Sequence, residues 1–147
     1  MDVTTDVLYT VEEYLELERN SSHDKHELWE GKIHLMPGAS KNHLALVTAL
    51  VVRLVLQLED TCQIYSSDAR VHIYGTENYF YPDVVVIQGE EEIIDDYVDN
   101  FTNPTIIFEV LSQSTESIDR GKKWENYQRI PSLQEYVLVS QDKAKVE

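Results

Sequence analysis

Two short apolar runs each carry a single carboxylate, and they constrain the fold more than any other feature of the sequence. The first run covers 81–87 (YPDVVVI) and contains Asp83, and the second covers 105–112 (TIIFEVLS) and contains Glu109. Apolar runs of this length, rich in β-branched residues, predict strands buried within a sheet. An ionised carboxylate in such a strand is costly unless a cation or hydrogen-bond donors compensate it. The fold must therefore supply a partner for each carboxylate.

The two carboxylates share a face of the sheet if their strands are neighbours, because alternate residues of a strand point to the same side. A divalent cation would then compensate both, since Mg²⁺ takes one or two protein carboxylates and completes its octahedron with water and substrate phosphate. Alternatively, each carboxylate caps a backbone turn or pairs with an arginine such as Arg70 or Arg120. Spacing alone leaves both interpretations open.

The remaining patterns predict an α/β chain. In order, we expect a helix over 9–20 capped by Thr10, a β-hairpin over 25–36, a long helix after 40, a strand over 62–74, an acidic loop over 88–104, a helix over 114–130 and a strand over 133–139. Strands flanked by helices in this order predict an α/β sandwich with a mixed sheet. A chain of 147 residues suits a single domain over 1–147.

Composition narrows the partners and the compartment. The chain has 12 basic and 27 acidic residues and a net charge of −15, which disfavours non-specific binding to a polyanion. One cysteine, Cys62, excludes an internal disulfide framework. No apolar run approaches the ~18 residues of a membrane span, and 1–10 lacks a signal-peptide pattern. We expect a cytoplasmic protein with no membrane partner, and the lack of a glycine-rich phosphate loop argues against nucleotide binding.

Five segments in one order resemble the Uma family of endonucleases, a branch of the PD-(D/E)XK nuclease superfamily. The segments are HELWEGKIHLMPGASKNH, YPDVVVI, IFEVLSQST, DRGKKWENY and LQEYVLV, and the resemblance extends over 9–146. It implies the restriction-endonuclease-like fold, a mixed sheet flanked by helices with an N-terminal helix and β-hairpin. It also implies hydrolysis of DNA phosphodiester bonds, with Mg²⁺ or Mn²⁺ held between Asp83 and Glu109.

The catalytic cation is the least obvious part of this resemblance. The superfamily carries a lysine two residues after the glutamate, whereas this chain, like the family, has an apolar residue there, Leu111. Lys123 is the candidate replacement, because it lies four residues from both Asp119 and Tyr127 on one helix face. Such a lysine would orient the attacking water or stabilise developing phosphate charge. The alternatives are an exposed Asp119–Lys123 ion pair and Lys122 as the cation.

Two further residues are candidates for the same site. Glu27, before the hairpin turn, matches a glutamate of the family and is a candidate catalytic residue or metal ligand; the alternative is a partner for Lys32 or Arg70. His43 stands in the first turn of the long helix, where the helix dipole favours a neutral imidazole. It either lines the cleft or is a satisfied, half-buried histidine.

Other residues carry weaker expectations. Asp68 is either a residue behind the metal ligands or a partner of Arg70. Trp124 and Tyr127, at helical spacing, are expected in the core.

Two functional hypotheses follow. The first is a metal-dependent endonuclease acting on DNA. The second is a catalytically inactive nuclease-fold protein that acts through protein–protein contacts, which the net charge and Leu111 favour. The family that the chain resembles continues past this point with further strands, whereas residues 140–147 resemble a turn entering one strand where the chain stops. The resemblance therefore implies a domain truncated at its C-terminus, with an open sheet edge. An open edge favours pairing with another chain, and a homodimer is the expected partner.

Overall fold

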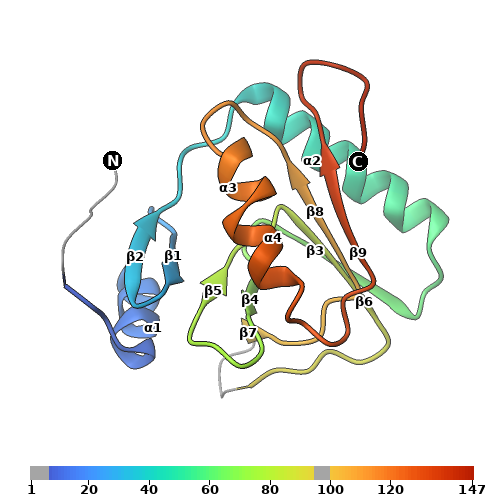
Figure 1. Cartoon of the computed structure of the whole chain (residues 1–147). Helices are drawn as coiled ribbons and strands as arrows, with labels where there is room; N and C mark the ends of the chain where they lie inside the picture. The colour runs from blue at the N-terminus through green and yellow to red at the C-terminus, as the bar shows by residue number, and fades with distance from the viewer. Residues whose placement is uncertain (1–6, 95–99) are drawn as a thin grey trace.

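The computed structural model describes residues 7–94 and 100–147, and these form two mixed sheets with helices packed around them (Figure 1). The α/β class expected from the sequence is confirmed. The elements in chain order are α1 (Val11–Asn20), β1 (His26–Trp29), β2 (Lys32–Leu35), α2 (Lys41–Gln57), β3 (Cys62–Ser66), β4 (Arg70–His72), β5 (Tyr79–Phe80), β6 (Val84–Gln88), β7 (Asn100–Phe101), β8 (Ile106–Val110), α3 (Glu116–Arg120), α4 (Lys122–Tyr127) and β9 (Glu135–Val139).

One sheet brings the two carboxylate runs together. Its strand order is β3-β6-β8-β9, with β6 antiparallel to β3 and β8, and β8 parallel to β9. Val84 pairs with Phe108 in the β6–β8 ladder, so one further step along the same register places Asp83 opposite Glu109. The two runs are therefore neighbours, as a shared face requires.

The second sheet contains the N-terminal hairpin and has the order β2-β1-β5-β4-β7. The hairpin turns at Glu30 and Gly31, whose φ angles are 51° and 79°. Two positive φ angles in succession match the twist that joins two antiparallel strands, and glycine adopts this conformation without strain. The predicted hairpin is confirmed, and it carries Glu27 on β1.

Two apolar clusters sandwich the β3-β6-β8-β9 sheet. On one face α2 packs its partly buried side chains against Val84, Val86, Phe108, Val110 and Val139. On the other face, side chains of both sheets and α4 form one cluster that includes Val71, Ile73, Phe80, Val85, Ile87, Ile107, Tyr127 and Ile130. Figure 1 shows α2 behind this sheet and α3 and α4 in front of it. No helix within 7–94 and 100–147 has the length and apolarity needed to cross a membrane.

The chain changes sheet at two places where the sequence predicts continuous strands. The expected strand over 62–74 divides into β3 and β4, which belong to different sheets. Between them Ser67 has a φ of 42°, uncommon for a residue other than glycine. The run over 81–87 begins as a strand only at Val84, because β5 pairs in the other sheet. Within the acidic loop, β7 pairs with β4, and 95–99 lie outside the described residues.

The expected helix over 114–130 is broken at Gly121. This residue has φ −106° and ψ −90°, and a Cβ there would lie 3.0 Å from the carbonyl oxygen of Ser117. The break separates α3 from α4. Tyr127 lies in the core as expected, whereas the prediction of a core position for Trp124 is wrong: it is exposed and stacks on Tyr136.

Candidate active site

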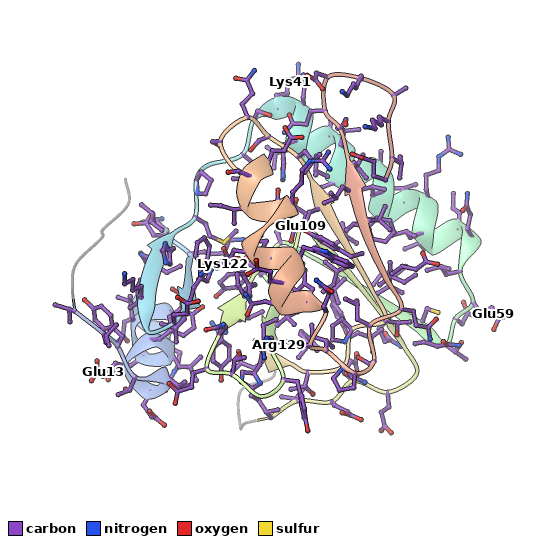
Figure 2. The ribbon with its side chains drawn as sticks, viewed as in Figure 1. Glu13, Lys41, Glu59, Glu109, Lys122 and Arg129 are labelled. Atoms are coloured by element: carbon purple, nitrogen blue, oxygen red, sulfur yellow. The ribbon has the colours of Figure 1, made fainter. Side chains whose placement is uncertain are left out.

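Lys123 lies among three buried carboxylates. Its Nζ is 3.3 Å from Glu109 Oε1, 3.6 Å from Glu27 Oε2 and 3.6 Å from Asp119 Oδ1. Lys123 is only 6% exposed, and all three carboxylate residues are buried. The group draws on α4, β8, β1 and α3, and Figure 2 shows Glu109 inside the molecule beneath the two short helices. Residues from four separate elements thus meet around one ammonium group.

Glu109 accepts its side-chain hydrogen bonds through one of its two carboxylate oxygens. Oε1 accepts hydrogen bonds from Lys123 Nζ at 3.3 Å and from the Tyr127 hydroxyl at 3.1 Å. Burial raises the pKa of Glu109 well above its usual value, and nearby carboxylates add to this, although Lys123 opposes both. Among the described residues, none donates a hydrogen bond to Oε2. Glu109 therefore keeps one oxygen for another partner.

Asp83 is compensated differently, by a backbone donor and a histidine. Its Oδ2 accepts the Val110 N–H at 2.7 Å and lies 3.2 Å from His43 Nε2. Burial would raise the pKa of Asp83, but the hydrogen bond and charge of His43 outweigh it and leave the pKa lowered. No donor in the described chain contacts Oδ1. Within the described residues, Asp83 thus resembles Glu109 in having one carboxylate oxygen that no protein donor contacts.

The helix N-terminus does not decide the direction of the His43 pKa shift. The hydrogen bond to Asp83 raises the pKa of the imidazole above its usual value, although burial opposes this. A hydrogen bond to a charged group contributes about 1.5–3 kcal/mol, whereas the helix dipole at a terminus contributes about 0.3–1 kcal/mol. The carboxylate therefore outweighs the helix N-terminus.

The arginine alternative for the two carboxylates is wrong. Arg70 donates to Asn100 and Tyr81, and Arg120 binds Glu116 and Glu147. The compensating cations are a lysine and a histidine.

Glu27 contacts both Lys123 and the second sheet. Besides Lys123, its Oε2 accepts the backbone N–H of Tyr81 at 2.7 Å. Burial raises the pKa of Glu27. The alternative of a pair with Lys32 or Arg70 is wrong, because Glu27 reaches Lys123 instead.

Asp119 is the carboxylate that sequence reasoning undervalued. It was expected at most as an exposed partner of Lys123, but both residues are buried. Thr115 Oγ1 donates to Asp119 Oδ2 at 3.3 Å, and burial raises the pKa of Asp119. The four-residue spacing of Asp119 and Lys123 was the sequence feature that indicated their contact. The fallback cation, Lys122, forms a surface pair with Glu30 at 3.0 Å, and Figure 2 labels it on α4.

The site holds more negative than positive groups. Four carboxylates face one lysine ammonium, that of Lys123, and the imidazole of His43. Burial would lower the pKa of Lys123, yet the surrounding carboxylates outweigh it and hold the pKa well above its usual value. Excess negative charge at low dielectric favours bound protons or a further cation. The donor set fits a hard ion that needs only one or two protein carboxylates. Within the described ranges, no three His, Cys, Asp or Glu side chains are grouped as metal ligands.

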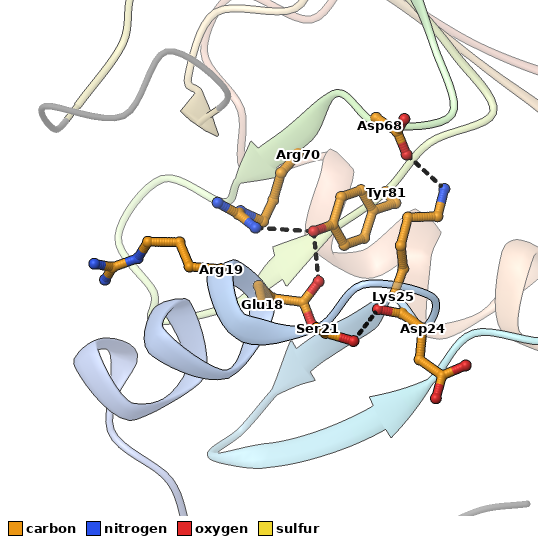
Figure 3. A pocket seen from close by; sticks show the side chains of 8 residues that line it. All are labelled: Glu18, Arg19, Ser21, Asp24, Lys25, Asp68, Arg70 and Tyr81. Atoms are coloured by element: carbon orange, nitrogen blue, oxygen red, sulfur yellow. Dashed lines mark hydrogen bonds and ion pairs between the residues drawn. The ribbon is translucent and has the colours of Figure 1, made fainter.

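A second polar region surrounds a cavity of about 190 Å³ that Tyr81 helps to line (Figure 3). The Tyr81 hydroxyl accepts from Arg70 and donates to Glu18 Oε2 at 2.7 Å. Asp68 lies at this cavity, 87% exposed, and pairs with Lys25 at 3.3 Å. Both expectations for Asp68, a place behind the metal ligands and a pair with Arg70, are therefore wrong.

Comparisons with known proteins agree on the family. The Uma2 family model, described as "Putative restriction endonuclease", matches 11–147. The uncharacterized Synechocystis protein sll1609 is 40% identical over all of this chain and 83% of its own length. Another, slr1290, is 37% identical over 92% of this chain and 70% of its own.

A solved structure agrees on the fold. It is a crystal structure from Anabaena variabilis, described as "a putative nuclease belonging to DUF820". Its TM-score is 0.68 at 19% identity, and the match covers 93% of this chain and 83% of that one. The restriction-endonuclease-like fold expected from the resemblance is confirmed, and this chain belongs to the Uma2 family.

Proposed function

We propose that the protein is a divalent-metal-dependent endonuclease that hydrolyses phosphodiester bonds of DNA. The observation that carries the proposal is the register of β6 and β8, which sets Asp83 opposite Glu109. Each of these carboxylates uses one oxygen for protein hydrogen bonds and has no protein donor on the other within the described chain. Membership of a family described as restriction endonucleases supports DNA as the substrate.

Asp83 and Glu109 would hold Mg²⁺ or Mn²⁺ through the oxygens that lack protein donors. A divalent ion bound there would polarise the scissile phosphate and lower the pKa of a water molecule. The Val110 N–H and His43 hold Asp83 in place through its other oxygen, so the ligand is oriented before any ion binds.

Lys123 and Glu27 would act on the reacting groups. Three carboxylates hold Lys123 as a cation next to Glu109, where it would stabilise the negative charge that develops on the phosphate. The raised pKa of Glu27 suits a group that accepts a proton from the attacking water. Asp119 would position the ammonium group without contacting the substrate.

A single domain over 1–147 and a cytoplasmic location belong to the same proposal. The cluster that joins both sheets and α4 supports one domain, because a shared core unites the elements. The free thiol of Cys62 is compatible with a reducing compartment.

The competing function is an inactive nuclease fold that acts through protein contacts. Two observations favour it. No group of three metal ligands is assembled in the described part of the chain, and the net charge of −15 opposes a polyanion.

Cleavage of supercoiled plasmid and of single-stranded DNA tests the proposal. We would compare Mg²⁺, Mn²⁺ and chelator for the wild type, Asp83→Asn and Glu109→Gln, with Asp68→Asn as the matched control outside the site. We expect metal-dependent cleavage that falls at least a thousandfold in both site variants, roughly 4 kcal/mol of transition-state stabilisation, and stays unchanged in Asp68→Asn. Cleavage that survives in both site variants would identify a contaminating nuclease.

Thermal unfolding separates the two functions when no cleavage is seen. An ion that binds the folded state raises the melting temperature by mass action. A rise with Mn²⁺ that disappears in Asp83→Asn supports the metal site. If the wild type does not cleave DNA and its melting temperature does not change with Mg²⁺ or Mn²⁺, the result supports the competing function, an inactive nuclease fold.

A further inference from the structure

The outer face of α2 is apolar along most of its length. Its inner face packs on the sheet, yet on the outside Leu44, Val52, Val55 and Leu56 are 58%, 51%, 60% and 76% exposed. A helix that is apolar all round is typically buried all round, and contiguous exposed apolar surface marks a contact site. Within the described chain nothing covers this face, and Figure 1 shows α2 along the outside of the sheet.

Four exposed residues on this face follow the spacing of a helix–helix contact. Ala45, Ala49, Val52 and Leu56 are separated by four, three and four residues, and all four are exposed. We call these residues the α2 seam. A repeat of four and three residues keeps side chains on one stripe of a helix, which is the pattern of packed helix pairs. The seam therefore suits another helix better than an irregular peptide.

We infer that the α2 seam binds a second copy of this chain, with the two α2 helices antiparallel about a two-fold axis. The side chains of the seam are small in its N-terminal half, Ala45 and Ala49, and larger in its C-terminal half, Val52 and Leu56. An antiparallel pair sets Ala49 opposite Val52 of the second copy, and Ala45 opposite Leu56 of the second copy. Small residues then face large ones, which fills the contact, and the same surface serves both copies. A parallel pair would set alanine against alanine and leave a gap.

Charge supports the same arrangement. Two chains of net charge −15 repel each other, but α2 contains no acidic residue, and its charged residues are Lys41 and Arg53. Repulsion is therefore weakest over this helix. The antiparallel register that pairs Ala49 with Val52 also brings Lys41, at the start of α2, to the end of α2 in the second copy, and the acidic residues Glu59 and Asp60 follow that end. Figure 2 labels Lys41 at one end of α2 and Glu59 at the other. An anionic membrane surface is the alternative partner for a broad apolar face. It would repel a chain that is itself strongly acidic.

The size of the contact predicts a weak dimer. α2 has 17 residues and is therefore roughly 25 Å long. A single helix pair of this length is small beside specific interfaces, which bury about 1,200–2,000 Å². We expect dissociation in the micromolar range.

Analytical ultracentrifugation tests the inference directly. The wild type is measured from about 1 to 100 µM, a range that brackets micromolar dissociation, beside Leu56→Asp and Val52→Asp. The matched control is Tyr74→Asp, which introduces the same charge at a residue 67% exposed outside α2. We expect a dimer weakened at least tenfold by both seam variants and unaffected by Tyr74→Asp, with all variants folded by circular dichroism. A monomeric wild type at the highest concentration, or a dimer indifferent to both seam variants, would overturn the inference.

A charge exchange tests the antiparallel orientation. Lys41→Glu and Asp60→Lys each place like charges at the helix ends that the antiparallel pair brings together and should weaken the dimer, whereas the double variant should restore it. Failure of the double variant to recover would exclude this register. Oxidative cross-linking of Ala49→Cys combined with Val52→Cys, in a Cys62→Ser background, should yield a covalent dimer. None of these readouts depends on nuclease activity, so the inference and the proposed function fail independently.

Discussion

The two faces of the β3-β6-β8-β9 sheet use the same strands in opposite ways. On β8, Phe108 and Val110 pack against α2 in an entirely apolar cluster. On the other side of the same strand, Glu109 meets Lys123 and the Tyr127 hydroxyl. The strand's alternation thus separates a face that is apolar throughout from a face that combines an apolar cluster with the buried charges around Lys123.

This difference teaches how a small domain tolerates a charged interior. Apolar burial stabilises the protein by about 25 cal/mol per Å² at any pH. The carboxylate face depends instead on protons and cations, because Glu27, Glu109 and Asp119 all have raised pKa values. Variants in the apolar α2 cluster and at the buried charges beside α4 should therefore respond differently to pH.

The largest effect is expected for Lys123→Met. Removing the ammonium group leaves three buried carboxylates without their shared cation. Breaking a buried pair in this way costs about 3–5 kcal/mol, measured by urea unfolding at neutral pH. The loss should shrink in acid, because the carboxylates then bind protons and no longer repel one another.

Lys122→Met is the matched control. Lys122 forms a surface pair with Glu30, and such pairs contribute about 0–1 kcal/mol. Equal losses in the two variants would contradict the special position of Lys123.

A smaller effect is expected on the apolar face from Val110→Ala. Val110 is buried against the α2 side of the sheet, and the substitution removes two methyl groups at about 0.8 kcal/mol each plus a cavity penalty. Urea unfolding should show a loss of about 2 kcal/mol that is the same at acid and neutral pH. The backbone N–H that binds Asp83 remains. A loss that varied strongly with pH would show that the two faces are not independent.

The smallest effect is a gain in stability for Glu109→Gln in chelator. The folded state holds a proton on Glu109 at pH values where the unfolded chain has released it, because burial raises the folded pKa above 4.5. Stability contributed by this residue therefore falls as pH rises through that window, and below it the penalty is absent. At neutral pH the variant should therefore have a higher melting temperature than the wild type, because the folded state no longer holds this raised carboxyl.

The gain should disappear near pH 4, where the wild-type carboxyl is protonated in both states. Calorimetry at acid and neutral pH measures it. A variant that is less stable than the wild type at both pH values would mean that the Glu109 charge stabilises the fold.

The parts of the fold set by local patterns could be predicted from the sequence. The Thr10 side chain accepts from Glu13 N–H as a helix cap should, and Ser40 does the same for α2. The hairpin followed from alternation and turn chemistry, whereas the adjacency of the two carboxylate strands could be stated only as a condition for a shared face. The helix caps and the hairpin depend on residues close in sequence.

Other parts depended on contacts that no local pattern encodes. The chain leaves one sheet for the other near Ser67, in the middle of the single strand expected over 62–74. Asp119 and Lys123 show the spacing of an exposed pair, and only the packing of α3 and α4 over the sheet buries them. His43 was judged from its helix alone, whereas its pKa depends on a carboxylate forty residues away in the chain.

The position of Lys123 has a consequence for how such sites are found. The ammonium reaches Glu109 from a helix 14 residues further along the chain, while Leu111 stands two residues after the glutamate. A pattern search that demands a lysine two residues after that glutamate overlooks this chain, although a lysine Nζ lies 3.3 Å from the carboxylate. A search by distance between an ammonium and a buried carboxylate finds it, whichever element supplies the lysine.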